Sequence, residues 1–431
     1  MKWLLLVSLS FSATLSTTLT AKEYSFEELL ECAKKHPEVE IESAQVALAE
    51  NDINKINGET LPKISVLAGV GPNYTRKGNA LASTRSNDVN AASYLANIKI
   101  QIPIFAFNRS GDYKTASHNN VLVKKIDVEK KQAELAKKLK EYYFGFQYAS
   151  NLHRFAQETL TDLNRALTEM EKSKAKNAQS DFEKLTLFKS MAMTKLFEIE
   201  KGLEQAQIGL KFITSDSEAT IAQDWIEFNP RELPPLSEML AKLEENNFDL
   251  RQAKVGLLAR ENLVKAEKKA YLPVFGIFAE ADLRHTPKSE SQQSVFAYDP
   301  FNRSDLTVGF GFIWDIDFGV KKSNVESATI EFNKLQRQMQ YAKTNLPLKV
   351  QVAYSEVVEA QKKIEELEKS YKLTKKMVTR IASGIALGLV PAKEIIESYT
   401  MRAEMYQQLY ESIYKYELRL ADLSYELGTN L

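Results

Sequence analysis

The sequence predicts a mainly helical protein that also carries membrane β-strands, built as two tandem structural repeats of long helical hairpins with two strands each. Three observations predict this fold. Gly (16) and Pro (12) are scarce in 431 residues, which favours long helices. Residues 37–62 align without a gap to residues 248–273, so that Leu61-Pro62 falls on Leu272-Pro273. Four segments alternate apolar and polar residues, as strands between two different solvents do.

The N-terminal segment is typical of a secretory signal. Lys2 is followed by an uncharged apolar stretch that ends at Leu19 and is too short to span a bilayer. We expect residues 1–21 to be the signal peptide. No later stretch approaches the roughly 18 to 20 consecutive apolar residues of a membrane helix. A membrane-embedded part would therefore have to consist of strands.

The two repeats are predicted over residues 22–214 and 236–431, and the Pro-containing segment 215–235 is predicted as a linker. Each repeat begins with a short and a medium helix, and in the first repeat Ser25 and Glu28 predict a capping box. Strands are expected at about 63–71, 94–104, 274–284 and 306–318. The long hairpins have predicted tips near 177–180 and 388–391, where Gly388 and Pro391 favour a helix end and a helix start.

The strands favour a membrane, although an ordinary half-buried sheet would give the same alternation. The joining segments 72–93 and 285–305 are polar and are expected to be long outer loops. Aromatic residues near the strand ends suit the headgroup level, and these are Tyr298, Phe301, Trp314 and Phe318. Four strands cannot close a barrel, and open edges are not tolerated in lipid. The chain must then oligomerise, and three copies would supply 12 strands.

The two long helices are expected over about 113–176 and 322–387. Each would extend about 100 Å at 1.5 Å per residue, which no compact domain needs. Val350, Val357 and Ile364 recur every seven residues, as in a coiled coil. Pro347 should either kink the second helix or mark the join of two stacked helices.

Several classes of function are disfavoured. Lys plus Arg equals Asp plus Glu, at 57 each, so nucleic acid is not an expected partner. The four histidines are scattered, and no phosphate loop, dinucleotide loop or His-Glu-x-x-His is present, so we expect no enzyme, cofactor or metal site. Cys32 is expected to be buried on the short first helix. A non-conducting periplasmic coiled-coil scaffold stays open as an alternative, but it leaves the strands unexplained.

Taken together, these residues resemble the TolC family of outer-membrane factors, the exit ducts of tripartite efflux pumps and type I secretion systems. The resemblance rests on Leu61-Pro62, Leu272-Pro273, the turn 103–105 and the tip Gly388-Leu389-Val390. It implies a homotrimer whose 12-stranded outer-membrane barrel continues into a 12-helix periplasmic tunnel. It also implies a periplasmic adaptor, an inner-membrane pump of the RND, ABC or MFS type, and passive conduction of an exported substrate that the sequence does not identify.

The resemblance also implies site residues at the tips. Adaptor docking is expected at Asn177, Ser180, Gly388, Leu389 and Val390. A pore constriction is expected from Glu394 and Glu397, which a three-residue helical step places on one face, together with Glu183. The family closes the tip with a Tyr and an Arg where this chain has Ile385 and Val390. Lys393 is a candidate partner for Glu183 in their place.

Overall fold

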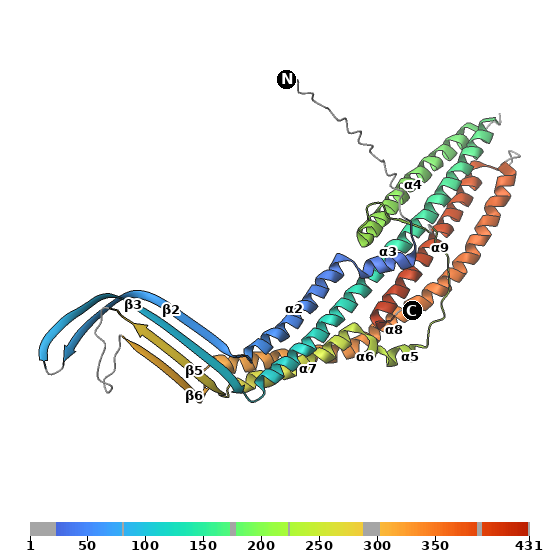
Figure 1. Cartoon of the computed structure of the whole chain (residues 1–431). Helices are drawn as coiled ribbons and strands as arrows, with labels where there is room; N and C mark the ends of the chain where they lie inside the picture. The colour runs from blue at the N-terminus through green and yellow to red at the C-terminus, as the bar shows by residue number, and fades with distance from the viewer. Residues whose placement is uncertain are drawn as a thin grey trace, which may run out of the picture. The chain divides into compact units, whose positions relative to one another are not determined.

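The computed structural model describes residues 23–79, 82–172, 178–222, 225–287, 302–385 and 390–429. The predicted signal peptide lies outside these residues. The first half of the chain contains β1 (Glu23–Tyr24), α1 (Phe26–Lys34), α2 (Pro37–Glu59), β2 (Lys63–Asn79), β3 (Ala82–Phe105), α3 (Arg109–Lys172) and α4 (Ala178–Thr214) (Figure 1). The remainder contains β4 (Thr220–Ile221), α5 (Leu236–Ala241), α6 (Leu243–Asn246), α7 (Phe248–Lys269), β5 (Val274–His285), β6 (Arg303–Ile313), α8 (Val320–Ile385) and α9 (Ala392–Leu427).

The chain forms two compact units that do not coincide with the two sequence repeats. Unit 1 comprises Met1–Pro37, Gln132–Leu236 and Val350–Leu431, and unit 2 comprises Glu38–Lys131 and Ser237–Lys349. Each unit therefore takes segments from both halves of the chain. The helices α3 and α8 contribute to both units, because the unit boundaries fall inside them. The boundaries of the two units do not test the two predicted sequence repeats, which therefore stay a prediction.

Unit 2 contains one four-stranded antiparallel sheet in the order β2-β3-β5-β6. The expected outer loop 72–93 is wrong, because β2 and β3 remain paired as far as Asn79 and Ala82. Backbone hydrogen bonds pair two strands whatever their side chains are. This polar hairpin therefore shows no alternation of apolar and polar residues in the sequence. The last strand is shorter than expected and ends at Ile313. Asp317 Oδ1 accepts from the backbone N–H groups of Gly319 and Lys321, which turns the chain into α8.

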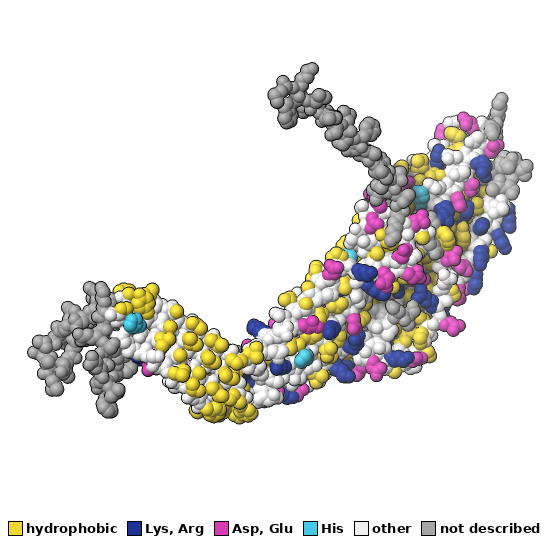
Figure 2. Space-filling model, viewed as in Figure 1, with side chains coloured by type: hydrophobic (Ala, Val, Ile, Leu, Met, Phe, Trp, Pro, Cys, Tyr) yellow, Lys and Arg dark blue, Asp and Glu magenta, His cyan; other side chains and the backbone are white. Residues whose placement is uncertain are grey.

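The sheet has one apolar and one polar face. On β6, Leu306, Val308 and Phe310 are 76%, 66% and 71% exposed. Figure 2 shows hydrophobic side chains gathered over these strands. The polar face holds Lys99 Nζ 3.3 Å from Glu280 Oε1 and Arg303 Nη2 3.1 Å from Asp282 Oδ1. A continuous apolar face of this kind requires a non-aqueous neighbour, whereas the ion pairs suit water.

The edges of the sheet are β2 and β6, since each pairs with a neighbour on one side only among the described strands. The pairing aligns the apolar face across all four strands. Ile64 lies opposite Ile100, Ile98 lies opposite Ala281, and Ala279 lies opposite Val308. A shift by one residue would move these side chains to the polar face, so the register is strongly specified.

Unit 1 packs long helices around an apolar core. The predicted heptad residues Val350, Val357 and Ile364 on α8 are fully buried, which confirms the coiled-coil spacing there. The helix α8 runs as one element through Pro347, so the alternative of two stacked helices is wrong. None of the described helices combines the length and the apolar character needed to span a membrane.

The N-terminal segment and the linker also belong to unit 1. Ser25 and Glu28 form the predicted capping box at the start of α1. Cys32 is half-buried on α1, so the expectation that it is buried is only partly met. The strand β1 pairs in parallel with β4 of the linker. Beyond β4, the linker crosses the helices, because Asn151 donates to the carbonyl of Ile226 over 3.2 Å and Gln361 donates to that of Arg231 over 3.1 Å.

Candidate functional site

The candidate site lies where α4 and α9 begin, in unit 1. Among the predicted docking residues, Asn177, Gly388 and Leu389 lie outside the described residues. Ser180 is exposed in the first turn of α4, whereas Val390 is only half-exposed, one residue before the cap of α9. The structure thus describes one residue of each expected docking tip.

An apolar cluster supports these helix starts. Its buried members come from α3, α4, α8 and α9, and they are Leu163, Ala166, Leu185, Val378, Ile395 and Tyr399. Val390 packs against this cluster. Part of the Val390 side chain therefore stabilises the helix starts, and only the remainder is available for contact with another molecule.

The two helix starts are joined by Asp181, a residue that the sequence analysis did not single out. Pro391 is the N-cap of α9, and its side chain makes no capping hydrogen bond. The Asp181 carboxylate on α4 accepts instead from the backbone N–H of Ala392, with Oδ2 and N 3.5 Å apart. A carboxylate is favourable here because a helix N-terminus has free N–H groups and a partial positive charge. The sequence held one indication of this contact, because Asp181 is an acidic residue in the first turn of α4.

The three glutamates predicted to line a constriction are all exposed. Glu394 and Glu397 lie three residues apart on α9, and Glu183 lies near the start of α4. Glu183 Oε1 accepts from Gln179 Nε2 over 2.9 Å. Lys393 Nζ lies 3.8 Å from Glu397 Oε1. Lys393 thus has a partner on its own helix, and its pairing with Glu183 stays a prediction.

The helix starts carry an excess of negative charge. Residues 178–185 and 390–397 contain the carboxylates Asp181, Glu183, Glu394 and Glu397 against Lys184 and Lys393. Within the described ranges, no group of three or more His, Cys, Asp or Glu side chains could hold a metal ion. Exposed carboxylates of this kind attract cations.

Comparisons with known proteins place this geometry in context. A sequence model described as "Outer membrane efflux protein" matches residues 239–392. The chain is 20% identical to the outer membrane protein TolC of Salmonella enteritidis over 434 residues, which cover 100% of this chain and 87% of the relative.

Solved structures share the fold. The outer membrane protein VceC of Vibrio cholerae gives a TM-score of 0.77 at 12% identity, covering 94% of this chain and 96% of VceC. The channel CusC gives 0.76 at 15% identity, with 94% and 92% covered. The open state of the outer membrane channel MtrE of Neisseria gonorrhoeae gives 0.73 at 15% identity, with 94% and 89% covered.

Proposed function

From the premise that this chain belongs to the TolC family of outer-membrane efflux proteins, we propose that the starts of α4 and α9 form its cation-favouring periplasmic gate. The chain is an outer-membrane efflux channel of a tripartite system that extends into the periplasm. We propose that this duct conducts its substrate passively. The gate is the part that decides what enters.

The observation that carries the proposal is the two-faced sheet with open edges. Lipid can cover the face of Leu306, Val308 and Phe310, but it cannot satisfy the edge hydrogen-bonding groups of β2 and β6. Pairing between copies satisfies them. We propose a homotrimer with a 12-stranded barrel and a 12-helix tunnel, since three copies of four strands give a size within the known range.

An apolar stripe on α4 supports the same assembly. Leu187 and Phe197 are 66% and 60% exposed on a helix of unit 1. These residues would be covered by the neighbouring copy, since large exposed apolar patches mark interaction sites. Native mass spectrometry of the detergent-solubilised protein should give three times the 48.9 kDa chain mass, less the three signal peptides. A monomer that conducts would overturn the proposed trimer.

The gate assignment rests on the exposed carboxylates. In a trimer, Glu394 and Glu397 would form two stacked rings, and Glu183 would add a third group of negative charges. Single-channel recordings in lipid bilayers test this directly. We expect Glu394→Gln with Glu397→Gln to lower the ratio of cation to anion permeability about threefold or more. A ratio equal to that of the unmodified channel would refute the gate, while conduction itself would persist.

The adaptor-docking residues stay a proposal as well. A periplasmic adaptor is proposed to contact the tips at Asn177, Ser180, Gly388, Leu389 and Val390, and an inner-membrane pump of the RND, ABC or MFS type would complete the system. A photo-crosslinking residue at Ser180 should capture the adaptor, because that side chain is exposed. The same residue at Glu218, exposed on the linker, is the control. Equal capture at both positions would argue against docking at the tips.

A further inference from the structure

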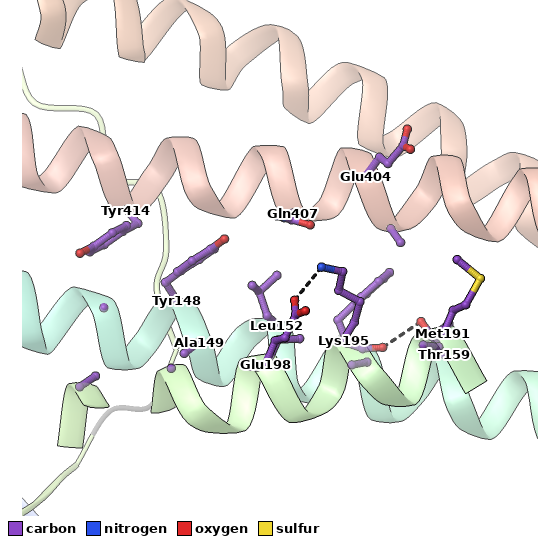
Figure 3. Close-up of a pocket in the computed structure, with 18 of the residues that line it drawn as sticks. Tyr148, Ala149, Leu152, Thr159, Met191, Lys195, Glu198, Glu404, Gln407 and Tyr414 are labelled. Atoms are coloured by element: carbon purple, nitrogen blue, oxygen red, sulfur yellow. Dashed lines mark hydrogen bonds and ion pairs between the residues drawn. The ribbon is translucent and has the colours of Figure 1, made fainter. Parts of the chain in front are cut away.

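A cavity of about 670 Å³ lies in unit 1 between α3, α4 and α9 (Figure 3). It is separate from the carboxylates of the gate, none of which lines it. Small residues keep it open, among them Gly145 and Ala149 on α3 and Gly202 on α4. A Cβ atom at Gly202 would meet nothing within 4 Å. The volume falls within the range of about 300 to 1,000 Å³ typical of small-molecule sites.

Aromatic rings form much of the cavity wall. Tyr148 on α3 and Tyr414 on α9 stack with their ring centroids 5.5 Å apart and their planes 3° from parallel. Figure 3 shows these two rings together at one end of the cavity. Burial raises the pKa of Tyr148 to about 12, with smaller contributions from Glu411 and Tyr414. Both rings are therefore neutral and can offer π faces to a ligand.

The charged residues around the cavity are mainly acidic. Its lining includes Glu141, Glu198 and Glu404 against Lys195. Lys195 Nζ and Glu198 Oε2 lie 2.6 Å apart and neutralise each other at an exposed position. Glu404 points away from the cavity (Figure 3). The remaining carboxylate is Glu141, for which no ion-pair partner occurs within the described part of the chain.

Glu141 lies near the end of the cavity where the tyrosines stack. Burial raises the pKa of Tyr414, and the negative charge of Glu141 adds to that rise. A carboxylate beside two aromatic faces favours a cation over an anion, because both the charge and the ring quadrupoles attract positive charge. The rest of the wall, including Leu152, Phe155 and Met191, suits an apolar body.

We propose that this cavity binds a small organic cation with an apolar body, held at its charged end by Glu141, Tyr148 and Tyr414. In the proposed trimer, the neighbouring copy would contact a different face of α4 from the one that lines the cavity. Phe188 lines the cavity while its neighbour Leu187 is 66% exposed, and consecutive helical residues point about 100° apart. The inference depends on the proposed channel only for its biological meaning, because binding can be measured in a protein that conducts nothing.

Two probes of similar shape and opposite charge give the sharpest test. The trimer in lipid nanodiscs is dialysed against tetraphenylphosphonium or tetraphenylborate, and binding to empty nanodiscs is subtracted. We expect saturable binding of the phosphonium, one per chain, and at least about tenfold weaker binding of the borate. Equal affinity for the two ions, or no saturable phosphonium binding, would overturn the proposal.

Three variants locate the binding. Glu141→Gln should weaken phosphonium binding about tenfold, since it removes the negative charge that attracts the cation. Glu171→Gln is the matched control and should leave the affinity within about twofold, because Glu171 is exposed on the same helix and does not line the cavity. Gly202→Leu should fill the open space and abolish binding while the trimer persists on native mass spectrometry. Unchanged binding in the Glu141 and Gly202 variants would show that the cation binds elsewhere, and channel recordings on the same samples test the gate separately.

Discussion

The carboxylate of Asp181 on α4 accepts from the backbone N–H of Ala392, the first residue of α9, across a distance of 3.5 Å. One side chain thus caps the second hairpin helix from the first, and Lys184 Nζ lies 3.5 Å from the same residue. This hydrogen bond joins the two helix starts in addition to the apolar cluster that contains Leu185 and Ile395.

Removal of this cap should loosen the start of α9. We expect Asp181→Ala to lower the stability of the first turn by about 1 kcal/mol, because Pro391 makes no side-chain cap of its own. Hydrogen exchange at the amides of residues 392–395 should then accelerate roughly fivefold. Asp181→Asn keeps an acceptor and should lose less protection. Equal exchange in Asp181→Ala and the unmodified protein would rule the cap out.

Stability should depend on pH through Glu417, a buried carboxyl on α9. Burial raises its pKa above the ordinary 4.5, although the positive charges of Arg231 and Lys140 oppose the rise. The folded chain then holds this proton more tightly than the unfolded chain, so its contribution to stability is present below pH 4.5 and is lost as the pH rises through the raised pKa.

The matching experiment is thermal unfolding at a series of pH values from pH 4.5 upward, because a carboxyl with a raised pKa loses its proton above its ordinary value. Glu417→Gln should flatten the fall in melting temperature across this range. Glu411→Gln is the control, because Glu411 makes a more exposed pair with Lys415. An unflattened curve for Glu417→Gln would mean that another group controls the pH dependence.

The carboxylates on the polar face of the sheet should contribute unequally to the stability of unit 2. Asp282 is 17% exposed and accepts from Arg303 and Asn97, whereas the Asp305 side chain is 56% exposed. Asp282→Ala should lower the stability of unit 2 more than Asp305→Ala does, because it leaves a partly buried guanidinium with less compensation. Asp305→Ala should cost less than about 1 kcal/mol. Urea titration followed by tyrosine fluorescence measures both, and equal losses would contradict the difference in burial.

Two helix glycines should respond to alanine in opposite directions. A Cβ at Gly209 on α4 would overlap the ring of Tyr142, while one at Gly58 on α2 would meet nothing within 4 Å. Gly209→Ala should destabilise by about 1 to 3 kcal/mol through overpacking. Gly58→Ala should stabilise by about 0.5 to 1 kcal/mol, since alanine favours a helix. Thermal unfolding decides, and a stabilising Gly209→Ala would show that Tyr142 moves aside freely.

Alternation and spacing predicted the parts of the fold in which the two sides of an element meet different surroundings. Leu306 and Val308 alternate with polar residues because lipid and water demand different side chains, and Val357 and Ile364 recur because a neighbouring helix covers them. The extension of β2 and β3 beyond Pro72 gave no such signal, since its pairing uses the backbone. The end of β6 was missed because Trp314, Ile316 and Phe318 continue the alternation after the chain has turned.

The site was predictable only in part. Exposure of Glu183, Glu394 and Glu397 followed from their positions near helix starts, and their proposed role came from the family resemblance. The contact between Asp181 and Ala392 depends on how two hairpins pack, which local sequence does not specify. The cavity depends on Gly145, Gly202 and Tyr414 from three helices, and no short motif joins residues so far apart.

The open sheet also has a consequence for biosynthesis. A newly exported chain carries the apolar face of Leu306, Val308 and Phe310 through water before it reaches lipid, together with the unpaired edges of β2 and β6. Such edges template wrong pairing and aggregation. The order of events therefore matters: we expect productive maturation to require a holding factor, or rapid assembly with the other copies of the proposed trimer, before the strands find any other partner.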